Sequence, residues 1–183
     1  TSHISRTIID GTYLPEKDSS SLVYFNPYGD STSVLTGFTL QNGKGTFVSS
    51  SDSEESFICG GAIIIDLGGA TITNNIIKNN ATIISVGNDD TWNGGWGGAI
   101  DCYGTLKGKT VIIADNTIMN NFNKSANQAM GGGIEVMCTY GKVIISGNRI
   151  IGNSVESAKS GYGGGIAILG VSNFSEIIIE NNF

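Results

Sequence analysis

The chain has 183 residues, with 27 glycines, only 14% charged residues and a net charge of −6. A helical bundle would contain more Leu, Ala, Glu and Lys, and a disordered chain would lack the 26 isoleucines of this sequence. The few Lys and Arg residues do not cluster, and no apolar run approaches the roughly 18 residues that span a bilayer. We therefore expect an all-β chain with many turns, no nucleic-acid partner and no insertion into a membrane.

The first predicted element is a coil over residues 1–43, and a two-part repeat follows it. The first block is a double glycine, a small residue and an isoleucine, and its four isoleucines are 37, 34 and 32 residues apart: Ile63, Ile100, Ile134 and Ile166. The second block is rich in Ile and Asn and occupies 72–80, 113–121 and 145–153, with a truncated copy at 179–183. A constant unit of this size predicts a solenoid.

The repeat divides the chain into cores and insertions. We expect one β-helix domain over residues 1–183, as a fragment of a longer chain. The predicted repeat cores are 60–80, 97–121, 131–153 and 163–183, and the predicted inserted polar loops are 44–59, 81–96, 122–130 and 154–162.

Each core predicts three short strands. Ile100-Asp101-Cys102 and Ile134-Glu135-Val136 alternate with period 2, a β-branched run follows near 111–114 or 143–146, and a third strand lies near 117–119. The preference for right-handed crossovers then predicts a right-handed parallel β-helix of four to five coils. Its core should contain a stack of Ile63, Ile100, Ile134 and Ile166, and the three cysteines are expected to be small buried residues.

Asparagines recur at two positions of the repeat. One set is Asn75, Asn116, Asn148 and Asn182, and the other is Asn80, Asn121 and Asn153. Asn tolerates the left-handed backbone of a tight corner, and stacked copies can bond from coil to coil, so we expect structural ladders.

The glycine boxes paired with Ile-x-x-Asn boxes, at Ile77 to Asn80, Ile118 to Asn121 and Ile150 to Asn153, resemble the repeats of polymorphic outer-membrane autotransporter adhesins. The opening stretch, with Ile8-Ile9-Asp10-Gly11 and Thr36-Gly37-Phe38-Thr39, is similar to secreted pectin-lyase-like β-helix proteins. The resemblance implies the fold and an extracellular or cell-surface location. Because that superfamily contains enzymes as well as adhesins, it implies no single activity.

Two acidic residues occupy one position of consecutive coils. Asp101 and Glu135 are expected on the exposed face of the first strand, about 4.8 Å apart along the solenoid axis. Such a pair suits acid–base chemistry or a shared cation. The alternative is a solvated pair whose side chains splay apart.

The segment 81–96 contains both tryptophans, Trp92 and Trp96, beside Asp89 and Asp90. Aromatic rings next to carboxylates suit sugar rings, and Tyr103, Tyr140 and Tyr162 could extend that surface. The alternative is that both tryptophans fold back over the sheet. No cofactor is expected, although Ca²⁺ could bind Asp89 and Asp90 with nearby carbonyl groups.

These features favour a segment that serves in adhesion or as a stalk, with an extended polysaccharide or cell-surface glycan as partner. The alternative is a polysaccharide lyase or glycoside hydrolase that uses Asp101 and Glu135. The chain has one histidine, His3, at its start, and no Lys or Arg at the exposed first-strand positions, which disfavours catalysis. The apolar last coil further predicts end-to-end self-association.

Overall fold

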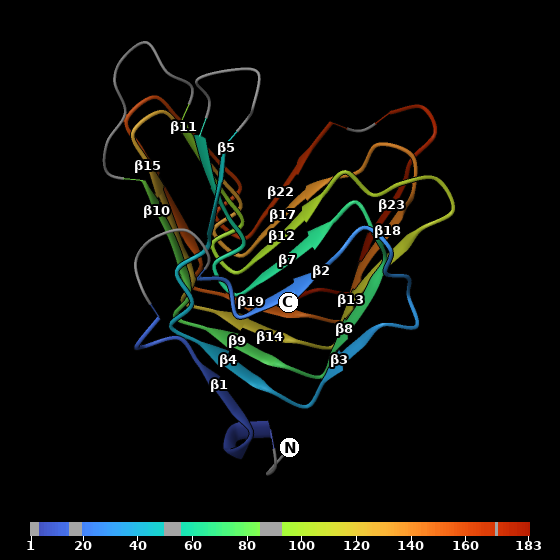
Figure 1. The fold of residues 1–183 in the computed structure, drawn as a ribbon, viewed down its shortest axis with the longest axis horizontal. Coiled ribbons are helices and arrows are strands. Elements are labelled where there is room, and N and C mark those ends of the chain that lie inside the picture. The colour runs from blue at the N-terminus through green and yellow to red at the C-terminus, as the bar shows by residue number, and fades with distance from the viewer. Residues whose placement is uncertain (1–3, 15–19, 50–55, 85–92, 171) are drawn as a thin grey trace.

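The computed structural model describes residues 4–14, 20–49, 56–84, 93–170 and 172–183. The described chain is a parallel β-solenoid of about four turns, which confirms the expected fold class (Figure 1). A short 3₁₀ helix, η1 (Ile4–Arg6), precedes the first strand. Three parallel sheets form the wall of the solenoid, one for each predicted strand of the repeat.

Each wall sheet stacks one strand from every turn, in the following spatial order. Sheet 1 consists of β2 (Val23–Phe25), β7 (Ile63–Asp66), β12 (Ile100–Tyr103), β17 (Ile134–Met137) and β22 (Ile166–Leu169). Sheet 2 consists of β3 (Val34–Thr36), β8 (Ala70–Thr73), β13 (Thr110–Ala114), β18 (Lys142–Ser146) and β23 (Glu176–Glu180). Sheet 3 consists of β1 (Ile8–Asp10), β4 (Thr39–Gln41), β9 (Ile76–Lys78), β14 (Thr117–Met119) and β19 (Arg149–Ile151).

The core is a set of isoleucine stacks enclosed by these sheets. Ile63, Ile100 and Ile134 are register partners and are wholly buried, as predicted. Ile166 continues the stack but is only partly buried, because β22 is the last strand of sheet 1 among the described residues. Self-association through the last coil stays a prediction.

Two of the three cysteines belong to this core. Cys102 and Cys138 are completely buried, as expected of small apolar side chains. Cys59 is only partly buried and lies at the end of a strand outside the three wall sheets.

The asparagine ladders are confirmed at both repeat positions. The Nδ2 of Asn116 donates to the Oδ1 of Asn148 at 3.0 Å, and the Nδ2 of Asn121 donates to the Oδ1 of Asn153 at 2.9 Å. The assignment of the left-handed backbone to these asparagines was wrong. It belongs to the residue before each ladder position, such as Asn74 (φ 55°) before Asn75 and Asn79 (φ 55°) before Asn80. The corner residue turns the chain, and the next asparagine points inward and bonds to the neighbouring turns.

The segments expected to be polar loops contain strands. Sheet 4 consists of β10 (Ala81–Ile84), β15 (Phe122–Ser125) and β20 (Ser154–Ser157). Sheet 5 consists of β5 (Thr46–Ser49), β6 (Ser56–Cys59), β11 (Asn93–Trp96), β16 (Gln128–Met130) and β21 (Ser160–Tyr162). All pairs in both sheets are parallel except β5 and β6, which form an antiparallel pair.

Some buried polar side chains of this two-sheet extension donate hydrogen bonds to its backbone, whereas Thr82 Oγ1, Asn123 Oδ1 and Gln128 Oε1 have no partner among the described residues. The buried Asn123 of β15 donates from Nδ2 to the backbone oxygens of Gly95 and Met130, at 2.7 and 2.8 Å. The buried Ser125 hydroxyl donates to the backbone oxygen of Asn93 at 3.1 Å. The extension stacks turn upon turn in the same way as the wall.

The double glycines form the corner between sheet 5 and sheet 1. The first glycine has positive φ in every copy: Gly60, Gly97, Gly131 and Gly163. A side chain on the second glycine of the first three copies would clash with the backbone of the next copy's glycine corner. The corner therefore requires glycine for backbone conformation and for close stacking. In Figure 1, sheet 5 and sheet 1 diverge from this corner.

Candidate functional site

The outer face of sheet 1 is the surface on which the sequence placed a functional site. Side chains alternate along its strands, so every second residue points away from the isoleucine core. Register pairing arranges these outward residues in two rows. The first row consists of Tyr24, Ile64, Asp101, Glu135 and Ala167. The second row consists of Asp66, Tyr103, Met137 and Leu169.

Asp101 and Glu135 are direct register partners, as predicted, but their expected exposure is wrong. Asp101 is 2% exposed and Glu135 is 0% exposed. A hydrogen bond joins the Cys59 thiol of β6 to the Asp101 side chain, so this face of sheet 5 is turned toward sheet 1. Because the segments taken for loops form sheet 5, they cover positions that a bare solenoid would expose.

Burial changes the acidity of both carboxyl groups. Desolvation raises the pKa of Asp101 to about 6, although hydrogen bonds with Glu135 and Cys59 act in the opposite direction. Desolvation, followed by the negative charge of Asp101, raises the pKa of Glu135 well above its ordinary value. Neither side chain forms an ion pair with any residue that the structure describes. The pair is therefore suited to holding a proton and not to meeting a polymeric substrate.

A different part of the same face is open to solvent. Tyr24 is 56% exposed and Tyr103 is 50% exposed. Asp66 lies between them, because it is the register partner of Tyr103 and accepts a hydrogen bond of 2.5 Å from the Tyr24 hydroxyl. That hydrogen bond is the main cause of a rise in the pKa of Tyr24 to about 12. We call Tyr24, Asp66 and Tyr103 the tyrosine platform.

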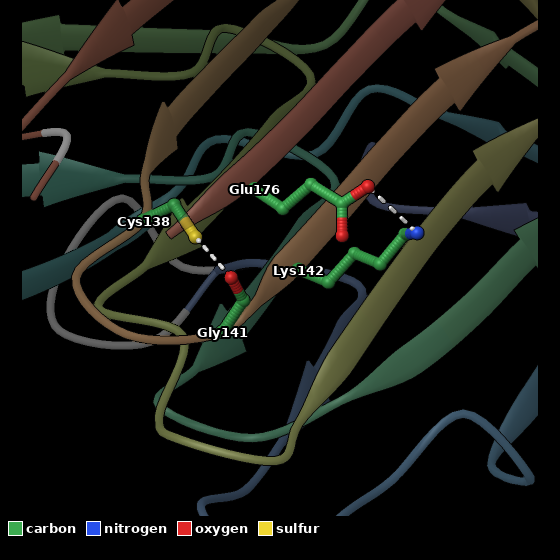
Figure 2. Close-up of polar contacts among 4 residues, drawn as sticks. All are labelled: Cys138, Gly141, Lys142 and Glu176. Carbon is green, nitrogen blue, oxygen red and sulfur yellow. Dashed lines mark hydrogen bonds and ion pairs between the residues drawn. The ribbon is translucent and has the colours of Figure 1, made fainter. Parts of the chain in front are cut away.

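A second exposed aromatic group lies at the turns between sheet 1 and sheet 2. The rings of Tyr140 and Phe174 stack with centroids 6.0 Å apart and planes inclined by 25°, and both are exposed. Figure 2 shows polar contacts beside the two turns: Lys142 pairs with Glu176 at 3.0 Å, and the Cys138 thiol donates to the Gly141 carbonyl oxygen at 3.4 Å.

Sequence reasoning singled out Tyr140 but not Phe174. The repeat contained the signal that could have identified Phe174. Tyr140 lies two positions before Lys142 and Phe174 lies two positions before Glu176, and Lys142 and Glu176 are register partners in sheet 2.

Of the remaining predicted site residues, the structure describes Trp96 and Tyr162. Trp96 is partly buried and packs edge to face against Phe57, with ring centroids 5.2 Å apart, which agrees with the alternative that it folds back over the sheet. Tyr162 of β21 is half exposed and belongs to the same register row as Trp96 and Met130. Asp89, Asp90 and Trp92 lie outside the described residues.

The described residues contain no group of three or more His, Cys, Asp or Glu side chains arranged to hold a metal ion. They also contain no helix of the length and apolar character that crosses a bilayer. Comparison with protein-family models, curated proteins and solved structures gives no significant match.

Proposed function

We propose that this β-solenoid segment is a binding module of a secreted or cell-surface protein, and that it holds an extended neutral polysaccharide on the outer face of sheet 1. The observation that carries the proposal is the tyrosine platform. Aromatic rings offer apolar faces to sugar rings, and a carboxylate between them can accept bonds from sugar hydroxyls. The Tyr24–Asp66 hydrogen bond holds one ring and the acceptor in place before any ligand arrives.

Charge favours a neutral polysaccharide over a polyuronate. The chain has a net charge of −6, and a carboxylate lies at the centre of the platform. A polyanion would bring like charges together at this position. The stacked Tyr140 and Phe174 at the neighbouring turns supply further aromatic surface for a long ligand.

The enzyme alternative is less well supported. It relied on Asp101 and Glu135 as an exposed acid–base pair, and both side chains are buried under sheet 5. A general acid must come within hydrogen-bond reach of the substrate. The resemblance of the repeats to autotransporter adhesins supports a role in adhesion or as a stalk, and glycan binding is compatible with both.

Titration with oligosaccharides of neutral glucans, mannans and galactans, followed by calorimetry, tests the proposal. Tyr24→Ala and Tyr103→Ala should each weaken binding of a responding glycan by about fivefold, since one stacked ring contributes about 1 kcal/mol. Tyr24→Phe keeps the ring and loses the bond to Asp66, so it should weaken binding less than Tyr24→Ala.

Tyr13→Ala is the matched control, because Tyr13 is 98% exposed and follows β1 of sheet 3, away from the platform. Equal losses of glycan affinity in Tyr13→Ala and Tyr103→Ala would show that the glycan does not bind at the tyrosine platform. Preferential binding of polygalacturonate would contradict the charge argument.

A further inference from the structure

The buried carboxyl groups of Asp101 and Glu135 lack some of the hydrogen bonds that buried polar groups require. As carboxylates, the two groups leave three of their four oxygens, Oδ1 of Asp101 and both Oε atoms of Glu135, with no donor to accept from, and the hydrogen bond between the two side chains requires a proton on one of them. Ionised carboxylates only accept hydrogen bonds, whereas a protonated carboxyl also donates one. Two carboxylates on adjacent strands, out of reach of water, satisfy each other only when one of them retains a proton.

The groups around the pair offer no compensating positive charge. From sheet 5, β6 presents the Cys59 thiol, and β11 and β16 present Trp96 and Met130 at the same register position. Within sheet 1, the flanking positions of the row are Ile64 and Ala167, and the nearest other charge is Asp66, which is bonded to Tyr24. The titratable groups around the pair are thus the Cys59 thiol and Asp66, and the half-exposed Tyr162 of β21 continues the sheet 5 row beyond Met130.

Because of where the pair lies, its protonation state affects the contact between sheet 5 and sheet 1. Asp101 and Glu135 lie where sheet 5 covers sheet 1, and the thiol of β6 bonds directly to Asp101 across that contact. A second negative charge there would have to be hydrated, and water could reach it only if the packing around the pair loosened.

We propose that Asp101 and Glu135 hold one proton between them and form a pH-sensitive joint, which keeps sheet 5 docked on sheet 1 while the proton is retained and loosens it when both carboxyls ionise. This inference is independent of the proposed glycan binding, because neither residue belongs to the tyrosine platform.

The direction of the pH effect follows from linkage. Both pKa values are raised in the folded chain, so the stabilising state is the protonated one, and its contribution is complete below the ordinary carboxyl pKa. The folding equilibrium constant should fall as pH rises, by about tenfold per pH unit for each proton that only the folded chain retains. For Asp101 the loss should begin near the ordinary carboxyl pKa of 3.8 and be complete above about pH 6.

Three measurements test the proposal on the wild-type chain and on Glu135→Gln, with Glu180→Gln as the control at an exposed acid of sheet 2. Infrared spectra at neutral pH should show a protonated carboxylic C=O stretch in the wild type and in the control, but not in Glu135→Gln. Urea unfolding across the pH range should give a shallower pH dependence in Glu135→Gln, because the amide donates to Asp101 at every pH. Hydrogen exchange in β6, β11 and β16, corrected for intrinsic rates, should accelerate with pH only where Glu135 is present.

Asp101→Asn provides a second variant should Glu135→Gln fold poorly, and it should flatten the pH dependence in the same manner. The proposal is overturned if the wild type shows no carboxylic stretch at neutral pH, or if its unfolding has the same pH dependence as both variants. It is equally overturned if Ca²⁺ or Mg²⁺, added to EDTA-treated protein, stabilises the wild type and not Glu135→Gln, since the pair would then be a cation site. If exchange in sheet 5 does not respond to pH, the pair holds a proton without acting as a joint, and the proposed joint is overturned.

Discussion

Two kinds of buried polar row run along this solenoid, amide and carboxyl, and they differ in how their members satisfy one another. At the corner between sheet 2 and sheet 3, each asparagine donates to the next and accepts from the previous one. On the outer face of sheet 1, Asp101 and Glu135 stack in the same manner but leave three oxygens without partners.

The difference lies in the chemistry of the amide and the carboxylate. A side-chain amide carries two donor hydrogens and an acceptor oxygen, so identical copies complement each other over any number of turns. Ionised carboxylates carry acceptors only, so a stack of two needs an added proton or cation. Stacking identical residues is therefore stabilising or costly according to whether the group both donates and accepts. Substitutions at three positions test this contrast, and they follow in order of decreasing expected effect.

Asn116→Ala should destabilise the fold by about 3–5 kcal/mol, because each buried group left without a partner costs about 1–3 kcal/mol. The Asn116 side chain donates to Ile72, Ala114 and Asn148, and its Oδ1 accepts from Asn75. Urea unfolding would measure the loss, with Asn173→Ala in an exposed turn as the control. A loss no larger than that of the control would show that the ladder does not contribute to stability.

Asn148→Asp places a carboxylate in the amide row, and we expect a loss of about 2–4 kcal/mol at neutral pH from the bonds that its Nδ2 donates. The loss should shrink at pH 5, because burial raises the pKa of the introduced acid and its protonated form donates again. Unfolding curves at the two pH values measure this change. A loss that is independent of pH would mean that the new carboxylate reaches solvent or finds another partner.

The smallest effect is expected at the exposed residue beside the ladder. Asn74 has φ 55° and points to solvent, so Asn74→Gly should change stability little, whereas Asn74→Ala should cost about 1–2 kcal/mol of left-handed backbone strain. Thermal unfolding of the two variants separates backbone conformation from ladder bonding. Equal, substantial losses in the two variants would show that the bond from Asn74 Nδ2 to the Thr73 hydroxyl, which both variants lack, matters more than strain.

Much of the wall could be predicted from the sequence, because its signals repeat. The isoleucine of each glycine box returns at nearly constant spacing, and that spacing alone predicts the buried stack of Ile63, Ile100 and Ile134. The ladder asparagines were recognised for the same reason. Their exact role was not, since the left-handed residue and the bonded residue are adjacent and Asn occupies both positions in the second turn, at Asn74 and Asn75.

The extension could not be predicted in this way, and the error at Asp101 and Glu135 follows from it. Its strands contain Gly94 and Gly95 in β11 and the polar Asn123 and Ser125 in β15, so apolar alternation does not mark them. Their stabilisation comes from parallel pairing with the neighbouring turns and from buried polar contacts, neither of which is visible in a single repeat. Without sheet 5, the outer face of sheet 1 would be exposed, as the sequence alone predicted.

The glycine corner has a consequence for how such a chain can change in length. Every copy offers the next the same backbone surface, so the turn that begins at Gly60 would meet the turn that begins at Gly131 much as it meets the one at Gly97. Whole turns can therefore be gained or lost by recombination between repeats without disturbing the pairing on either side, each changing the height by about 4.8 Å. The length of the solenoid can therefore vary in steps of one turn while the fold stays the same.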